Sequence, residues 1–229
     1  MGLTEDMQKI FDCNLKHGIC PTMLKGDMIE AIKNIKSLSE KYDRKSSSIK
    51  YVVGNLFDEL PIFTTKKAII IPHIVNTLGL WGSGFVVPLG KIWPITKREY
   101  QKWYKQNFDY ERNTEFILGE IQIVQVEDFD KNRGPVFVAN MLAQDGIISS
   151  QNPHPIEYQS LNNCLLDMNT LALDLNGNGY DVEIHAPAFG SCRSGGHWPT
   201  IAKMIDDILA AYPIFIYTLT QEEQDNLFQ

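Results

Sequence analysis

Two glycine-containing segments follow apolar, β-type runs and carry the residue types that bind anions. The first, PHIVNTLGLWGSGF, spans residues 72–85, and the second, HAPAFGSCRSGGHW, spans residues 185–198. Glycine lets the backbone approach a ligand closely and point successive N–H groups at an anion, and a following helix adds the positive end of its dipole. Two such loops could grip a diphosphate. Each could also be only a tight strand-to-helix connection, because neither contains a Walker motif or a full GxGxxG motif.

His73 is the residue of greatest mechanistic interest in the first segment. It precedes Asn76 by three residues on a β-type run. An imidazole titrates near neutrality, so His73 could activate water or protonate a leaving oxygen. The alternative is a histidine that is packed in the core. No histidine pair has HxxxH spacing and no acid completes a cluster, so the sequence predicts no metal site.

Composition describes an ordinary globular chain. Its 229 residues include 21 Lys and Arg against 28 Asp and Glu, a net charge of −7. A non-specific nucleic-acid binder is expected to carry the opposite sign, so we expect no nucleic-acid partner and local binding of any anion. The four cysteines form no CxxC pair, and the N-terminus resembles neither a secretory signal nor a membrane span. We therefore expect a cytoplasmic protein with no membrane partner.

The elements that must position these loops are strands that alternate with helices. Runs rich in Val, Ile, Phe and Tyr cover residues 49–57, 66–76, 117–127, 135–144, 181–189 and 212–219. Helical spacing of apolar residues covers residues 85–106, 155–175 and 198–211. This order predicts an α/β fold whose largely parallel or mixed sheet is covered on both faces, with ligands at the carboxyl ends of the strands.

The first part of the chain reads differently. Apolar residues recur at helical spacing from Met28 to Leu38, and the polar run DRKSSS follows. We therefore predict an N-terminal helical extension and linker over residues 1–48, and one domain over residues 49–229.

The motifs together resemble a known family. GNLFD, HIVNTLGLWGSGF, VANMLAQDGI, PIEY, PAFGSCRSGGHW and IYTL have the order and spacing of the macro domain, which binds ADP-ribose. The resemblance covers roughly residues 49–220 and implies a three-layer α/β/α fold with a mixed, largely parallel sheet. His73, Asn76, Trp81 and Gly82 are arranged as in the branch that includes ADP-ribose 1″-phosphate phosphatases.

The resemblance assigns roles to the first half of the site. Asn55 stands where the family has an acid that recognises the adenine amino group, and an Asn carbonyl can still accept that hydrogen bond. Asn76 corresponds to the Asn that orients the distal ribose. The phosphate next to that ribose would be wrapped by Gly82, Ser83 and Gly84. Turn formation is the alternative role for Asn55 and Asn76, and Trp81 is either a wall over the sugar or a core anchor.

The second half of the site comes from the loop after the fifth predicted strand. The resemblance implies ligand contacts from Gly190, Ser191, Cys192, Arg193, Ser194 and Gly195, mostly through backbone N–H groups. Arg193 is either a phosphate partner or a solvated surface residue, and Cys192 has no arrangement that would make it a nucleophile. Tyr217 is either an aromatic wall against adenine or a core residue.

The implied activity is hydrolysis of ADP-ribose 1″-phosphate to ADP-ribose and phosphate, with His73 as the catalytic residue and no cofactor. The alternatives are a non-catalytic module that binds ADP-ribose, free or attached to protein, and a de-ADP-ribosylating hydrolase. The family branch that removes ADP-ribose from protein glutamate uses a Lys and an Asp where this chain has Gln144 and Ser194. The resemblance therefore disfavours that route.

Overall fold

The computed structural model describes residues 47–59, 67–107, 117–128 and 134–228. These residues belong to a unit that spans Ser47–Gln229. The helix and linker that the sequence predicts before Ser47 lie outside the described residues, so the division into residues 1–48 and 49–229 stays a prediction. Within the described ranges, no helix is both long and apolar enough to cross a membrane.

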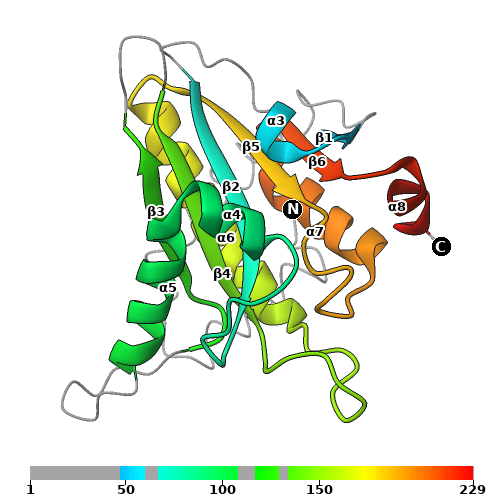
Figure 1. The fold of residues 1–229 in the computed structure, drawn as a ribbon. Helices are drawn as coiled ribbons and strands as arrows, with labels where there is room; N and C mark the ends of the chain where they lie inside the picture. The colour runs from blue at the N-terminus through cyan, green and yellow to red at the C-terminus, as the bar shows by residue number, and fades with distance from the viewer. Residues whose placement is uncertain (1–46, 60–66, 108–116, 129–133, 229) are drawn as a thin grey trace, which may run out of the picture. The chain divides into compact units, whose positions relative to one another are not determined.

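Six strands form one mixed sheet, as the sequence predicts (Figure 1). Their bounds are β1 Ile49–Val53, β2 Lys67–Asn76, β3 Ile121–Glu127, β4 Val136–Gln144, β5 Asp181–Pro187 and β6 Ile214–Thr218. The order across the sheet is β1-β6-β5-β2-β4-β3. All neighbours are parallel except β3 and β4, which pair antiparallel. The five parallel strands therefore present their carboxyl ends at one edge of the sheet.

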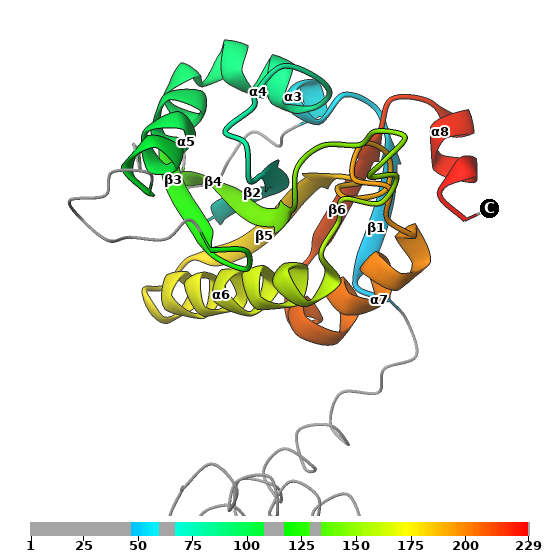
Figure 2. The ribbon, with the colours of Figure 1, turned by 90° about the horizontal axis from the view of Figure 1, so that it is seen from below.

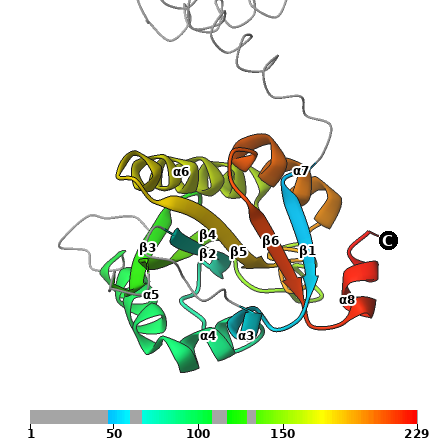
Figure 3. The same cartoon turned by 90° about the horizontal axis from the view of Figure 1, so that it is seen from above.

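Helices cover both faces of the sheet (Figures 2 and 3). The helices α6 Tyr158–Gly177 and α7 Trp198–Leu209 cover one face, and α3 Leu56–Glu59, α4 Val86–Ile92 and α5 Pro94–Asn107 cover the other. The central strand β2 alternates between the two cores: Ile70 packs in the core under α6 and α7, whereas Ile69 and Ile71 pack in the core under α4 and α5. The predicted three-layer α/β/α fold is confirmed.

The helices differ from the sequence prediction in three places. The helix expected over residues 85–106 is two helices, because the chain leaves helical geometry at Trp93 and Pro94 begins α5. The strand expected over residues 49–57 ends at Val53, and α3 begins at Leu56. The helix α8 Gln221–Asn226 has no buried residue and therefore no apolar periodicity to predict it.

Candidate functional site

Two loops meet at the carboxyl edge of the sheet, near the ends of β2 and β5 (Figure 1). The first loop, residues 77–85, follows β2, and the second loop, residues 188–197, follows β5. Their contact is direct: a Cβ built on Gly84 would lie 3.2 Å from both Cδ and Nε of Arg193. The structure therefore brings together the two loops that the sequence singled out.

The first loop exposes Leu78, Leu80 and the continuous stretch of Gly82, Ser83 and Gly84. Gly84 has a φ of +73°, a conformation that side chains rarely adopt, whereas a Cβ on Gly82 would meet no atom within 4 Å. Open space lies beside the backbone at Gly82, as close approach by a phosphate requires.

Asn76 braces the same loop with its side chain. Its Oδ1 accepts hydrogen bonds from the backbone N–H groups of Leu78 (3.0 Å) and Leu80 (3.1 Å), and its Nδ2 donates to the Leu80 carbonyl (2.9 Å). Asn76 thus fills the turn-forming role that the sequence left as the alternative. A contact with the distal ribose stays a prediction, and the second N–H of Nδ2, which these three bonds do not use, is the donor for it.

The glycines of the second loop serve packing. A Cβ on Gly190 (φ +81°) would lie 2.9 Å from the Cδ1 atoms of Ile156 and Ile201, and one on Gly195 (φ +64°) would lie 2.3 Å from the Pro153 carbonyl oxygen. These residues must be glycine because protein atoms already occupy the space beside them. Packing within the protein therefore explains both glycines without a bound phosphate.

The hydroxyl groups of the second loop are engaged within the protein. Ser191 donates to the Ala188 carbonyl (2.7 Å), and the buried Ser194 donates to Oε1 of Gln144 (2.6 Å). Cys192 and Arg193 are exposed. Among the described residues, Arg193 has neither an ion-pair nor a hydrogen-bond partner, so its guanidinium is available to an anion at the junction of the two loops.

His73 lies in the core beneath the first loop. Its ring is only 2% exposed, and Nε2 lies 2.6 Å from Oδ1 of Asn140, the residue opposite it on β4. Burial lowers the pKa of His73 to about 4, against the smaller opposing effect of the Asn140 hydrogen bond. The imidazole is therefore neutral at pH 7.

Trp81 is also in the core. Its indole is 8% exposed, meets His73 edge-on with ring centroids 5.4 Å apart, and packs against Tyr100 at 5.6 Å. A Cβ on Gly90 of α4 would lie 2.7 Å from the indole Nε1. The structure therefore matches the core-anchor alternative for Trp81.

The two residues expected at adenine lie at the β1–β6 side of the sheet. Tyr217 is 7% exposed on β6, and its hydroxyl lies 2.9 Å from Nδ1 of His185. Asn55 is exposed after β1, where its side chain accepts from the Phe57 N–H (3.3 Å) and donates to Asp58 (2.9 Å). Asn55 thus caps α3, while Tyr217 packs as a core residue.

A polar connection joins the residues that follow β2 and β4, and the sequence offered Asp145 in it only as a loop-start residue or a local acid or base. Thr77 donates to Oδ1 of Asp145 (3.0 Å) and accepts from the Gly146 N–H (2.8 Å), and Asn152 donates to the Asp145 carbonyl (2.9 Å). Asp145 directly follows a predicted strand, and that position was the available signal. The exposed Asp145 carboxylate is thereby held beside the first loop.

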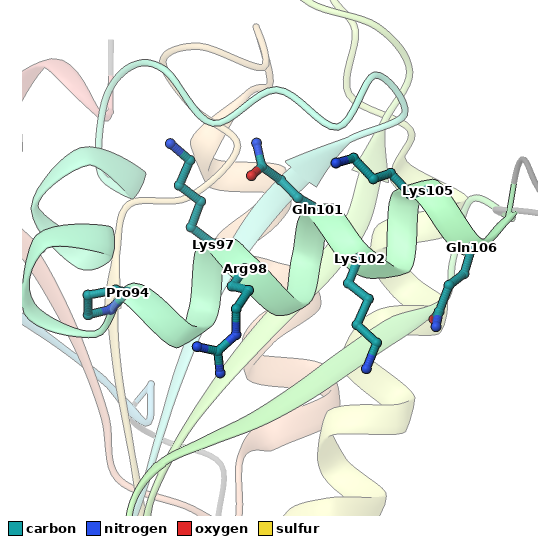
Figure 4. Close-up of a pocket in the computed structure, with 7 residues that line it drawn as sticks. All are labelled: Pro94, Lys97, Arg98, Gln101, Lys102, Lys105 and Gln106. Atoms are coloured by element: carbon teal, nitrogen blue, oxygen red, sulfur yellow. The ribbon is translucent and has the colours of Figure 1, made fainter.

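A shallow, open hollow of about 600 Å³ lies away from both loops, on the outer surface of α5 (Figure 4). Every residue that lines it comes from that one helix: Pro94, Lys97, Arg98, Gln101, Lys102, Lys105 and Gln106. Figure 4 shows long polar side chains projecting from the helix on both sides. None of the predicted site residues lines this hollow.

Comparison with known proteins gives three relevant similarities. The chain is 26% identical over 164 residues to a protein from Lodderomyces elongisporus named ADP-ribose 1″-phosphate phosphatase, across 70% of this chain and 92% of that protein. A crystal structure of a protein from Bacteroides thetaiotaomicron is 30% identical with a TM-score of 0.59, across 74% and 98% of the two chains. A macrodomain protein from Streptomyces coelicolor is 28% identical with a TM-score of 0.56, across 74% and 98%. No family model matches the sequence.

A more distant structure shares the fold. Thermosipho africanus DarTG in complex with ADP-ribose has a TM-score of 0.56 at 16% identity, across 79% of this chain and 44% of that one. The fold and the paired loops define an α/β/α domain with two loops that meet at the carboxyl edge of a mixed sheet. In fold and in sequence, the chain is similar to macrodomains.

Proposed function

We propose that this protein binds ADP-ribose and hydrolyses ADP-ribose 1″-phosphate to ADP-ribose and phosphate. The observation that carries the proposal is the junction of the exposed Gly82–Gly84 backbone with the exposed Arg193 guanidinium. Backbone N–H groups and a guanidinium together complement the oxygens of a diphosphate or a phosphate monoester. The name and coverage of the Lodderomyces elongisporus relative support the same substrate.

The reaction adds water to the 1″-phosphate. The water oxygen forms a new bond to phosphorus, the bond between phosphorus and the sugar oxygen breaks, and that oxygen takes up a proton. Arg193 and the first loop would stabilise the charge on the transferred phosphoryl group. The resemblance put His73 forward as the catalytic residue, but its ring is 2% exposed, so direct proton transfer would require Trp81 or Phe85 to move aside.

Calorimetric titration and a phosphate-release assay test the proposal. ADP-ribose is expected to bind with micromolar affinity, about −8 kcal/mol, and AMP much more weakly because it lacks the second phosphate and the distal ribose. Release of phosphate from ADP-ribose 1″-phosphate would support the enzyme. Equal affinity for AMP and ADP-ribose would contradict the assignment of Asn76 and the first loop to the distal end of the ligand.

Two alternatives predict different outcomes. A non-catalytic module would bind ADP-ribose, free or attached to protein, and release no phosphate. A de-ADP-ribosylating hydrolase would release ADP-ribose from a modified protein, yet Ser194 and Gln144 hydrogen-bond each other at 2.6 Å, and neither can replace a reactive Lys. Phosphate release by the unmodified protein separates the phosphatase from both alternatives, and release of ADP-ribose from a modified protein separates those two from each other.

A further inference from the structure

The imidazole of His73 is bracketed by the two aromatic residues that flank the exposed backbone of the first loop. Trp81, immediately before Gly82, meets the ring edge-on at 5.4 Å between centroids. Phe85, immediately after Gly84, meets it at 5.9 Å. Both ends of the Gly82–Gly84 segment therefore rest on one buried ring.

The orientation of that ring follows from a chain of hydrogen bonds that begins at a backbone carbonyl. Nε2 of Gln122 lies 3.1 Å from the carbonyl oxygen of Glu99 on α5, and a carbonyl can only accept. Oε1 of Gln122 must therefore face Asn140, which donates to it through Nδ2 at 2.9 Å. That leaves Oδ1 of Asn140 to accept, at 2.6 Å, from a protonated Nε2 of His73.

The other ring nitrogen is poorly placed for proton transfer. Nδ1 of His73 is buried and has no hydrogen-bond partner within the described residues. Neither Trp81 nor Phe85, the aromatic neighbours of the ring, can carry a proton to or from it. A general base needs hydrogen-bond contact with the proton that it accepts, directly or through one water. The geometry instead suits a rigid support held in one tautomer.

We infer that His73 is a positioning residue which, fixed by Asn140 and Gln122, supports the Gly82–Gly84 segment from below through Trp81 and Phe85. The inference rests on the proposed function in taking that segment as the phosphate-binding element. It replaces proton transfer by His73 with a structural link from α5 through β3, β4 and β2 to the loop.

Glutamine at position 73 separates support from proton transfer. Its amide can donate to Asn140 much as the imidazole Nε2–H does, but it cannot act as a base near neutral pH. His73→Ala removes both functions, and Asn140→Ala removes only the fixation of the ring. Met168→Ala is the matched control, because Met168 is a fully buried residue of α6 that packs in the other core, so its loss destabilises the fold without touching the loop.

The first readout needs no ligand. In NMR spectra of the full chain, the Trp81 indole and the amides of Gly82, Ser83 and Gly84 are expected to shift in His73→Ala and Asn140→Ala and to return toward their original positions in His73→Gln. Met168→Ala should leave them in place. Unshifted signals in both alanine variants would overturn the inference whether or not the protein binds ADP-ribose.

The second readout uses ADP-ribose and its 1″-phosphate. ADP-ribose affinity per folded molecule is expected to fall about tenfold in His73→Ala and Asn140→Ala, with no further loss in the double variant, because the two residues act through one chain. His73→Gln should recover most of the affinity and the turnover. Unchanged affinity in His73→Ala together with lost turnover in both position-73 variants would overturn the inference in favour of direct catalysis. A wild-type protein that binds ADP-ribose but releases no phosphate would refute the proposed reaction and leave the binding comparison in force.

Discussion

At the scale of single residues, the glycines of the two loops differ in what surrounds them. Beside Gly82 there is open space, whereas three isoleucine side chains surround Gly190. The sequence predicted a common role for both, close approach to a phosphate. Only the packing shows that Gly82 suits that role and that Gly190 is required by the core.

Gly82→Val is therefore expected to lower ADP-ribose affinity about tenfold or more while the free energy of unfolding changes by less than about 0.5 kcal/mol. Gly190→Ala should lower the free energy of unfolding and leave the ADP-ribose affinity of the folded protein nearly unchanged, since its Cβ would enter the core at a φ of +81°. Calorimetry and urea unfolding of both variants measure the contrast. Normal binding by a folded Gly82→Val protein would exclude the first loop from the phosphate site.

Arg193→Ala is expected to weaken ADP-ribose binding about tenfold, because a charge-assisted hydrogen bond contributes about 1.5 to 3 kcal/mol. The effect should diminish at high salt. Arg98→Ala, which removes the same charge from the outer surface of α5, is the control for net charge. Equal losses of ADP-ribose affinity in the two variants would show that Arg193 acts only through the net charge of the protein.

Stability is expected to depend on pH through His73. The folded ring has its pKa lowered to about 4, so below the unfolded value of 6.5 the unfolded chain binds a proton that the folded state does not. Stability therefore falls as the pH drops from about 6.5 to about 4, by about 3 kcal/mol for this group. The lowered pKa of His185, also caused by burial, acts in the same direction. Urea unfolding at pH 7, 5.5 and 4.5 gives the free energy of unfolding at each pH, and we expect it to fall less steeply with decreasing pH in His73→Gln than in the unmodified protein. An identical pH dependence would contradict a lowered pKa for His73.

At the scale of elements, α4 and the first loop depend on each other. Gly90 lies within α4, where alanine would ordinarily stabilise a helix by about 1 kcal/mol. Here the added Cβ would come within 2.7 Å of the Trp81 indole. Gly90→Ala is expected to displace Trp81, cancel the helix gain and reduce ADP-ribose affinity. Thermal melts and titrations check both effects, and a variant that is more stable and binds normally would contradict the link.

The central strands β2 and β4 could be predicted because they are long, mostly apolar runs, and the structure buries both along nearly their whole length. Pro94 signalled that the helix expected over residues 85–106 would break, but helical spacing of apolar residues continues on both sides of it, so one helix was predicted. The partners of Asn76, Ser194 and Asn140 could not be predicted, since each amide or hydroxyl has several chemically equivalent partners until the loops are placed. Residue types fixed the candidate loops, and tertiary packing decided which groups in them are free.

At the scale of the whole molecule, ligand binding should stabilise the domain by mass action. ADP-ribose at about one hundred times its dissociation constant is expected to raise the free energy of unfolding by about 3 kcal/mol, and AMP at the same concentration by much less. Differential scanning fluorimetry across a concentration series measures this. Equal shifts with both nucleotides would contradict the two-loop site.

A chain that begins at Ser47 is expected to remain folded and to bind ADP-ribose. Ser48 must be kept, because its N–H and hydroxyl both bond Oδ1 of Asp206, at 3.1 and 2.9 Å. Removing two further residues should lower the melting temperature by exposing that carboxylate. If the chain that begins at Ser47 yields no soluble protein, the domain boundary lies nearer the N-terminus.

The pairing of β1 with β6 has a consequence for how the domain is made. Ile49 lies opposite Ile214, so, of the six strands described, the first to leave the ribosome pairs only with the last. Until then β1 offers an unpaired backbone while β2, β4 and β5 can already assemble. We expect nascent chains that stop before β6 to be captured by chaperones, and closure of this final pair to be the slow step of folding.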